Sequence, residues 1–314
     1  MCEIWAMGEM LVEIMRPRVG MELFEEGEFL GPFPSGAPVI FIDTVARLGH
    51  TAGILGGVGK DDFGRNILDR LKKDGVNVDY VFEDERRSTA VAFVTYFEDG
   101  SRKFIYHIDN TPAICSKPLD IKDIRDPKYF HIMGCSLMAS DTLRKKIIDC
   151  AADFSRNGAK ISFDPNIRLE LLGSRAMDEV IGAVLKQCSV IMPGLQELKL
   201  LTGEDTVEEG IRKLFENEKM EIVALKGGQG GSTIYSRHEK VDCPFFDVYQ
   251  VDPTGAGDCF DAAFLCGLLE ERTLSEAGEM ASAAGALNVM KLGPMEGDIS
   301  ADSVSRMVGA YRKT

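Results

Sequence analysis

The sequence predicts an α/β protein in which a doubly wound, mostly parallel sheet is flanked by helices, with a small β-sheet beside it. Three observations predict this fold class. Short β-branched runs alternate with amphipathic stretches over most of the 314 residues. Each run ends in Gly, Pro or Asp, as buried parallel strands that lead into loops commonly do. One segment breaks this rhythm and alternates apolar with polar residues.

The main sheet is predicted from short runs that follow one another along the chain. Between these runs lie helical stretches such as residues 141–158, where apolar residues recur every three or four positions and Gly158 ends the helix. Strand and helix in alternation favour parallel pairing, because the chain must cross back over the sheet between strands. The predicted strands lie within residues 3–8, 52–59, 129–134, 159–166, 189–194 and 221–228.

The small sheet is predicted from two separate segments. Residues 88–109 read as a β-hairpin, with Asp99-Gly100 placed to form a two-residue turn. Residues 10–16 and 24–33 add further short strands. We expect the segments at about 11–34 and 88–110 to form a lid on one single domain that spans residues 1–314.

The overall charge excludes two classes of partner. The chain has 50 acidic and 36 basic residues and a net charge of -14, which argues against nucleic acid and against an anionic membrane surface. No run has the length and polarity of a membrane span or a signal peptide. The eight cysteines form no C-x-x-C pair, so we expect reduced thiols and a cytoplasmic protein.

Two familiar glycine-rich phosphate motifs are absent. A P-loop before Gly59-Lys60 would need glycine where Ile54 stands and a hydroxyl residue where Asp61 follows. The dinucleotide pattern G-x-G-x-x-G fails after Gly255 and Gly257, because Phe260 takes the last position. The sequence therefore predicts neither P-loop nor Rossmann cofactor binding.

The stretch VDPTGAGDCFDAAF, residues 251–264, predicts a different phosphate site. Gly255 and Gly257 leave main-chain N–H groups uncovered just before a helix that we expect to begin at about Asp258. These amides and the positive end of the helix suit an anion without any lysine. The carboxylate of Asp258 then suits a general base that takes the proton from an attacking hydroxyl. The alternative role for Asp258 is a first-turn acid that only stabilises the helix.

Longer segments resemble one known family. DPTGAGDCF, residues 252–260, resembles the C-terminal signature of the ribokinase-like (PfkB) carbohydrate kinases, and residues 34–77 resemble the glycine-rich N-terminal region of that family. FDPNIRLELL, residues 163–172, resembles a segment of its fructokinase-like and ketodeoxygluconate-kinase-like members. The resemblance covers nearly the whole chain. It implies a parallel sheet with a β lid, ATP as phosphoryl donor and a sugar hydroxyl as acceptor.

The resemblance also implies roles for individual residues. Asp258 takes the place of the catalytic base, and the anion hole for the transferred group is formed by Gly255, Ala256 and Gly257. The ATP-binding positions are Lys226, Gly228, Gly230 and Asn288. Some members hold a monovalent cation such as K+ at positions that match Asp252, Thr254, Asn288 and Gly293. Mg²⁺ is expected to arrive with ATP, with Glu197 as an outer-shell contact.

The sugar site is expected to differ from that of other members. Substrate-binding positions are Glu13, Ser35, Gly36, Ala37, Tyr106 and Arg168, and His107 could face either the sugar or the solvent. Ile40 stands where the family usually has an Asn that touches the sugar, Glu13 replaces an Asp, and Gly194 replaces the Asn three residues before Glu197. A site without a polar anchor at position 40 disfavours ribose.

The sequence thus predicts an ATP-dependent kinase that phosphorylates a primary hydroxyl. The acceptor is expected to be a keto-sugar such as fructose or tagatose, or a keto-sugar acid such as 2-keto-3-deoxygluconate. Two alternatives stay open: a nucleoside kinase, for which Phe97, Phe104 and Tyr106 could sandwich a base, and a catalytically idle sugar-binding sensor. We also expect a homodimer formed through the lid, because a small open sheet leaves unpaired edges.

Overall fold

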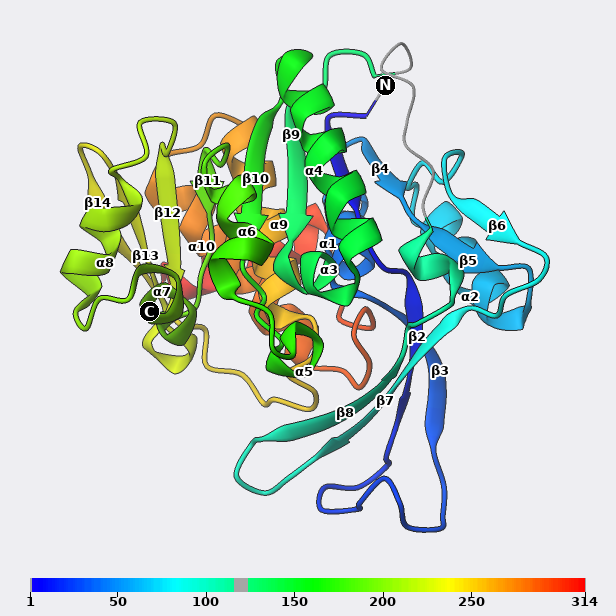
Figure 1. Ribbon diagram of the computed structural model, residues 1–314. Helices are drawn as coiled ribbons and strands as arrows, with labels where there is room; N and C mark the ends of the chain where they lie inside the picture. Colours follow the sequence, from blue (N-terminus) through cyan, green and yellow to red (C-terminus); the bar gives the residue numbers. More distant parts are fainter. Residues whose placement is uncertain (1, 116–123, 314) are drawn as a thin grey trace.

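The structure is a computed structural model that describes residues 2–115 and 124–313. Its centre is an eight-stranded sheet in the order β14-β13-β12-β11-β10-β9-β1-β4 (Figure 1). All neighbouring strands from β12 to β4 in this order pair parallel to one another. β13 pairs antiparallel with β12, and β14 pairs antiparallel with β13. The predicted doubly wound, mostly parallel sheet is therefore confirmed. Its strands are β1 (Ile4–Met7), β4 (Ala52–Leu55), β9 (Tyr129–Met133), β10 (Lys160–Asp164), β11 (Val190–Ile191), β12 (Ile222–Lys226), β13 (Ser232–Ser236) and β14 (Lys240–Cys243).

Helices cover both faces of this sheet and bury two hydrophobic cores. Alternate residues of a strand point to opposite faces, so β1 sends Ile4 and Ala6 into one core and Trp5 and Met7 into the other. The first core receives side chains from α1 (Ala37–Arg47), α2 (Asp62–Lys73), α9 (Ala256–Leu269), α10 (Leu274–Val289) and α11 (Ala301–Tyr311). The second receives them from α3 (Gly134–Ala139), α4 (Asp141–Arg156), α5 (Leu169–Leu172), α6 (Met177–Leu185), α7 (Leu195–Thr202) and α8 (Val207–Leu214).

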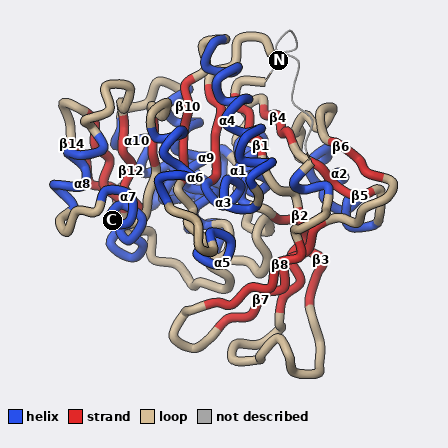
Figure 2. Tube along the Cα trace, viewed as in Figure 1, coloured by secondary structure: helices blue, strands red, loops and turns tan. Residues whose placement is uncertain are grey.

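A second sheet of four strands, here called the small sheet, projects from the body (Figure 2). Its order is β3-β2-β7-β8, and it is built from the two segments that the sequence indicates. The strands are β2 (Leu11–Met15), β3 (Leu30–Ser35), β7 (Ala90–Tyr96) and β8 (Arg102–His107). The run at 52–59, which the sequence predicts as one strand, is divided: β4 joins the main sheet, whereas β5 (Gly57–Gly59) pairs with β6 (Phe82–Asp84).

The hairpin of the small sheet is confirmed, but its predicted two-residue turn is wrong. Phe97 N donates to Ser101 O at 2.9 Å, and Gly100 N donates to Phe97 O at 3.0 Å, so the loop comprises Glu98, Asp99 and Gly100. Gly100 has a φ of 79°, which is typical of the left-handed residue that closes a three-residue hairpin loop. Glycine adopts this conformation at little cost because it has no Cβ.

The carboxyl ends of β1, β9, β10, β11 and β12 all lie at one edge of the main sheet, because these strands run parallel. Loops from this edge are where open α/β sheets bind ligands. Short 3-10 turns, η1 (Pro112–Ile114) and η3 (Gly228–Gly230), follow β8 and β12. Within the described ranges, no helix is long and apolar enough to cross a membrane. All eight cysteines are free thiols.

Candidate active site

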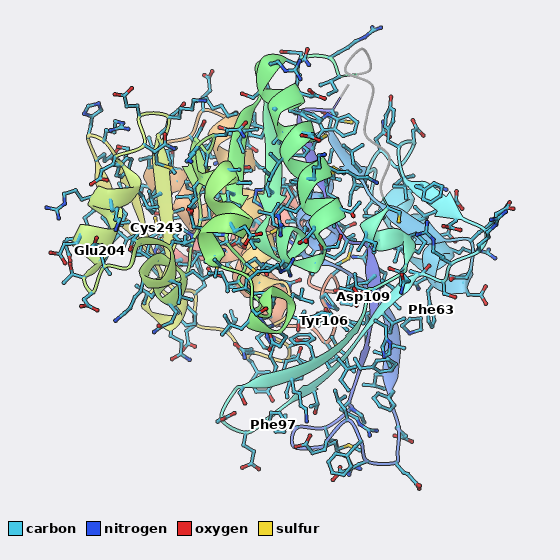
Figure 3. All side chains as sticks on the ribbon, viewed as in Figure 1. Phe63, Phe97, Tyr106, Asp109, Glu204 and Cys243 are labelled. Atoms are coloured by element: carbon cyan, nitrogen blue, oxygen red, sulfur yellow. The ribbon has the colours of Figure 1, made fainter. Side chains whose placement is uncertain are left out.

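A cavity of about 180 Å³ lies between the small sheet and the carboxyl ends of the main strands. It is here called the polar cavity, because carboxyl, guanidinium and amide side chains contribute to its wall. Figure 3 labels Tyr106 where the small sheet meets the body, at this cavity. The cavity brings together residues that are far apart in the chain: Glu13, Ser35, Gly36, Ala37, Ile40, Tyr106, Arg168, Glu197, Lys226, Thr254, Gly255, Gly257 and Asp258.

The loop before α9 presents bare main chain to this cavity. α9 begins at Ala256, two residues earlier than predicted, and Gly255 is its N-cap residue with a φ of 80°. A Cβ at Gly255 would lie 2.5 Å from Pro294 O, so the close approach of the two loops requires glycine. The first main-chain N–H groups of this helix have no acceptor within the helix. They lie at the positive end of the helix dipole, which is the end beside the cavity. The loop is therefore suited to an anion.

Asp258 is buried at the floor of the polar cavity. The residue is 7% exposed, and Asn166 Nδ2 donates to its Oδ1 at 3.2 Å. Burial raises the pKa of Asp258 to about 7, and the negative charge of Asp164 adds to this rise. The positive charges of Arg168, Lys226 and Arg102 oppose it. A carboxyl with a pKa near 7 can exchange a proton with a bound hydroxyl at neutral pH.

Lys226 lies at the end of β12, inside a cluster of acids. Its Nζ is 3.1 Å from Asp164 Oδ2 and 3.1 Å from Asp261 Oδ1, and both carboxyls are almost fully buried. These two charges, with that of Glu197, raise the pKa of Lys226 above its ordinary value even though burial opposes this. Lys226 therefore stays a cation, and it lies on the wall of the polar cavity.

Glu197 holds two loops together. Its Oε1 accepts from Ile167 N at 2.8 Å, and its Oε2 accepts from Gly194 N at 2.8 Å. Burial, with the negative charge of Asp164, raises the pKa of Glu197. Gly194, which stands where the family usually has Asn, contributes only its main-chain N–H to this contact. Both carboxylate oxygens are thus already used by the protein.

Two further glutamates line the polar cavity, Glu13 from β2 of the small sheet and Glu9 from the loop between β1 and β2. Ser35 Oγ donates to Glu13 Oε1 at 2.7 Å, whereas Glu13 Oε2 is buried without a partner among the described residues. Burial raises the pKa of Glu13 to about 7. Glu9 accepts from Cys135 Sγ at 3.2 Å and from Ser136 Oγ, and burial raises its pKa as well. These carboxyls give the cavity an excess of hydrogen-bond acceptors.

Arg168 lies opposite these acids. Its Nη1 donates to Ile167 O at 3.1 Å, and within the described part of the chain no carboxylate forms an ion pair with it. Burial lowers the pKa of Arg168, but the electrostatic effect of its acidic neighbours, among them Asp258 and Asp164, raises it above its ordinary value. Arg168 therefore offers free N–H donors to a ligand in the polar cavity.

A second cavity of about 290 Å³ adjoins the first at Lys226, Pro253 and Gly257. It is here called the apolar cavity. Gly228, Gln229 and Gly231 close one side of it. The remaining wall comes mainly from the loop after β14 and from α9 and α10: Ser232, Pro244, Phe245, Phe246, Val248, Gln250, Ala256, Phe260, Ser282, Gly285, Ala286 and Val289. An elongated ligand could fill both cavities past Gly257.

Comparisons with known proteins show which family the chain belongs to. The model of the "pfkB family carbohydrate kinase" matches residues 33–301, which is most of the chain. The chain belongs to the pfkB family. Fructokinase-1 of Zea mays is 32% identical over 299 residues, covering 91% of this chain and 91% of the relative. Probable fructokinase-4 of Arabidopsis thaliana is 30% identical over 301 residues, covering 92% and 91%.

Solved structures show the same likeness. An E. coli structure described provisionally as Ribokinase II, in an apo form, has a TM-score of 0.93 and 36% identity, covering 99% of this chain and 100% of that one. Fructokinase of Vibrio cholerae, with fructose, ADP and calcium ion bound, has a TM-score of 0.82 at 22% identity, covering 98% and 99%. The second likeness shows the fold alone. Together with the family model, the curated relatives identify a carbohydrate kinase.

Most residues singled out in this kinase from its sequence converge on the two cavities, with some exceptions. Gly228 lines the apolar cavity, and Gly230 lies in the same 3-10 turn. Asn288 lines neither cavity: it is fully buried, and its Nδ2 donates to Thr254 O at 2.7 Å. His107 is exposed on the face of β8 opposite Tyr106, so the period of two along the strand removes it from the cavity.

Several residues of the site carried no role in the sequence analysis. Asp164 and Asn166 lie within the quoted FDPNIR segment, at the carboxyl end of a predicted strand, so the position of that strand end could have indicated them. Glu9 and Cys135 also follow strands, but neither belongs to a motif that stands out. Asp261 lies one helical turn after Asp258, which is a weak signal without a known partner.

Replacing Gly255 or Gly257, in the loop before α9 and in its first turn, with alanine is expected to change the stability of the protein in opposite directions. Gly257 is helical, and a Cβ added to it would have Lys226 Nζ as its nearest neighbour, at 3.6 Å. Alanine is more stable than glycine within a helix by about 0.5–1 kcal/mol. Gly257→Ala should therefore raise the melting temperature slightly. The new methyl should nevertheless lower turnover, because Gly257 faces both cavities.

Gly255→Ala should instead lower both quantities, because of its positive φ and the contact with Pro294 O. Melting curves and ADP release measured on both variants check the pair. A Gly257→Ala variant with normal turnover would contradict a phosphate site at this loop.

Proposed function

We propose that this chain transfers the γ-phosphoryl group of ATP to a primary hydroxyl of a keto-sugar. The observation that carries the proposal is the position of Asp258: a buried carboxyl with a pKa near 7 in the polar cavity, directly after Gly257, where the polar and the apolar cavity adjoin. An acceptor hydroxyl in the polar cavity would meet the carboxyl, and the amides of Gly255 to Gly257 would face the migrating group.

The residues of this chain perform two tasks in the proposed reaction. Asn166 holds Asp258 by its side-chain amide, which leaves the second carboxyl oxygen free to accept the proton of the sugar hydroxyl. The small sheet covers the polar cavity with Phe104 and Tyr106, and this lid excludes water that would compete as an acceptor. The apolar cavity suits the adenine and ribose of ATP, with Gly228 and Gly230 in the loop that covers it.

Mg²⁺ is proposed to arrive with ATP. The described residues contain no cluster of three or more His, Cys, Asp or Glu side chains that could hold a metal by themselves. Two acids near the proposed phosphate site already have partners in the protein. Glu197 accepts hydrogen bonds from two main-chain N–H groups, and Asp164 forms an ion pair with Lys226. They fit outer-shell contacts to a hydrated ion, which would neutralise charge on the phosphates when bound.

The polar cavity favours a neutral ketohexose such as fructose or tagatose as the acceptor. Glu13 Oε2 and Asn166 Oδ1 are buried acceptors without a partner among the described residues. Hydroxyl groups can donate to both, whereas a carboxylate cannot. The second candidate is a keto-sugar acid such as 2-keto-3-deoxygluconate, and the unpaired guanidinium of Arg168 favours it.

A substrate panel tests this function. ADP release from Mg-ATP is measured with fructose, tagatose, 2-keto-3-deoxygluconate, ribose and adenosine, on the wild type and on Arg168→Gln. We expect the largest kcat/KM for a ketohexose and little change in the ratio of ketose to ribose in the variant. A preference for the acid that Arg168→Gln abolishes would select the second candidate. Activity with adenosine alone, or with none of the compounds, would support the nucleoside kinase or the idle sensor.

We further propose a cytoplasmic homodimer that forms through the small sheet. The free thiols suit a reducing compartment. The face of the small sheet away from the polar cavity exposes Phe29 and Ile105, at 39% and 44%, and β3 and β8 are its unpaired edges. We expect the mass of a dimer in light scattering, and a monomer for Ile105→Glu. A wild type that is monomeric at micromolar concentration would contradict this.

A further inference from the structure

The loop between α10 and α11, residues 290–299, lies against the residues that precede α9. It is here called the 290s loop. Gly293 N donates to Asp252 Oδ2 at 2.9 Å, and Pro294 O would lie 2.5 Å from a Cβ at Gly255. The two segments are therefore in direct contact through their main chains, and the position of the 290s loop limits where Gly255 can lie.

Asp252 is the buried acceptor in this contact, and it is 1% exposed. Besides Gly293 N, two other donors hold it: Thr254 N is 2.9 Å from its Oδ1, and the Tyr96 hydroxyl is 2.8 Å from the same oxygen. A carboxylate that has left water needs such donors to stay in place. Loss of the Gly293 donor would therefore loosen the segment from Asp252 to Gly257, here called the glycine loop.

Two arginines from other helices hold the 290s loop. Arg47, the last residue of α1, donates from Nη1 to Met295 O at 3.1 Å and from Nη2 to Gly297 O at 2.5 Å. Arg70 of α2 donates from Nη2 to the same Met295 O. One guanidinium can bridge two carbonyls because its N–H groups form a rigid fork. The 290s loop thus connects α1 and α2 to the glycine loop.

Acidic side chains surround these arginines, whose own side chains are 17% exposed. Asp43 lies one turn before Arg47, and its Oδ2 is 3.8 Å from Arg47 Nη1 and 3.6 Å from Arg70 Nη2. Burial raises the pKa of Asp43 to about 8, and the charge of Arg70 opposes this rise. Arg70 also pairs with Asp74 and Glu296. Arg47 is the simpler residue to test, because its hydrogen bonds within the described ranges go to the 290s loop.

We propose that Arg47 and Arg70 are positioning residues for the glycine loop and act through the 290s loop. This inference rests on the proposed function, because it assigns the amides of the glycine loop to the phosphoryl group. Neither arginine lines the polar or the apolar cavity, so each would affect the reaction only through the carbonyls that it binds. The alternative is a purely structural role, in which the arginines stabilise the fold without any effect on the glycine loop.

Amide hydrogen exchange tests the connection without any substrate. It reports how readily main-chain N–H groups open locally. We expect Arg47→Gln, and to a smaller extent Arg70→Gln, to speed exchange in peptides from both the 290s loop and the glycine loop. Arg65→Gln is the matched control, because Arg65 is an arginine of α2 with a 78% exposed side chain. It should change neither segment. Faster exchange confined to the 290s loop, or spread evenly over the chain, would overturn the proposal.

Steady-state kinetics test the effect on the reaction, at a temperature well below the melting temperature of every variant. We expect Arg47→Gln to lose about tenfold in kcat with little change in KM for the sugar, because the amides shift while the walls of the polar cavity stay in place. Arg47→Lys should recover part of the loss, since an ammonium keeps the charge but cannot bridge two carbonyls.

A second control separates positioning from stability. Ile147→Val removes a methylene group from the second core, where Ile147 is 0% exposed, so it should lower the melting temperature and leave kcat unchanged. All assays contain the same concentration of KCl, because the family resemblance implies a monovalent cation at Asp252 and Gly293.

A wild-type kcat in Arg47→Gln would overturn the proposal, as would a loss of kcat that Ile147→Val shares. If Arg47→Gln does not fold, Arg47→Lys and Arg70→Gln carry the same comparison. A wild type that phosphorylates none of the sugars would count against the proposed function alone, because the exchange measurement still decides whether the arginines control the glycine loop.

Discussion

Asp258→Asn is expected to lower kcat by a factor on the order of 10² or more while ATP still binds, because an amide cannot accept the proton of the sugar hydroxyl. The hydrogen bond from Asn166 can persist, since the Asn side chain keeps an oxygen at the position of Oδ1. ADP release with saturating sugar gives kcat, and equilibrium titration with ATP gives the affinity. Near-normal turnover would contradict the role of Asp258 as the base.

The same variant separates catalysis from helix stabilisation. If Asp258 were only a first-turn acid of α9, its replacement would cost about 0.5–2 kcal/mol of stability. Burial raises its pKa, so the charged form is disfavoured in the folded state, and we expect Asp258→Asn to melt no lower than the wild type at pH 8. Asp302→Asn is a matched control, because Asp302 is an exposed first-turn acid on α11. It should leave turnover unchanged.

The pKa of Asp258 also predicts the pH dependence of the reaction. The base must be a carboxylate, so kcat/KM should fall about tenfold per pH unit below the pKa near 7 and level off above it. Glu13 titrates in the same range, with a pKa raised to about 7. Glu13→Gln should therefore keep the inflection if Asp258 causes it. A profile that becomes flat in Glu13→Gln would assign the inflection to Glu13 instead.

Lys226→Met is expected to lower the free energy of unfolding by about 3–5 kcal/mol, the usual cost of removing one partner from a buried ion pair. Asp164 and Asp261, at 2% and 0% side-chain exposure, would both lose their cation. Burial and the charge of Asp164 raise the pKa of Asp261 well above its ordinary value, so the charge left without a cation would be that of Asp164, next to Asp258. Urea unfolding measures the effect, and adding Asp164→Asn to the variant should recover part of it.

Lys160→Met provides the matched control for that loss. Lys160 also lies on a strand of the main sheet and pairs with Glu221 at 2.6 Å, but both side chains are 48% exposed. Solvent screens such a pair, so its removal should cost no more than about 1 kcal/mol. Equal losses in the two variants would contradict a buried charge cluster around Lys226.

The main sheet could be predicted from the sequence because its strands are short apolar runs with clear ends, and the family resemblance agreed with them. Smaller features were harder to predict. The run at 52–59 reads as one strand, yet β5 leaves the main sheet to pair with β6. The turn at Asp99-Gly100 has three residues because Phe97 and Ser101 pair across it, which depends on strand register.

Some residues of the candidate site could likewise be predicted from the sequence, whereas others could not. Gly255, Gly257 and Asp258 could be identified because they are neighbours in the chain and form a recognisable pattern. Asn166, which orients Asp258, lies 92 residues away, and Tyr96 lies 156 residues from Asp252. Such contacts depend on which strand ends and which faces of the two sheets lie against one another. Patterns of neighbouring residues in the sequence do not specify this packing. Asn288 was assigned to ATP from the family resemblance, and the structure shows it buried and donating to Thr254 O.

By itself, the sequence determined the layered α/β fold, the glycine loop before α9 and the acid that follows it, because each depends on residues close together in the chain. Only the tertiary structure decided how the pKa of that acid is raised, which glutamates and which arginine face the polar cavity, and which donors hold Asp252. The physical reason is that pKa values and hydrogen-bond partners are set by burial and by charges brought together from distant segments.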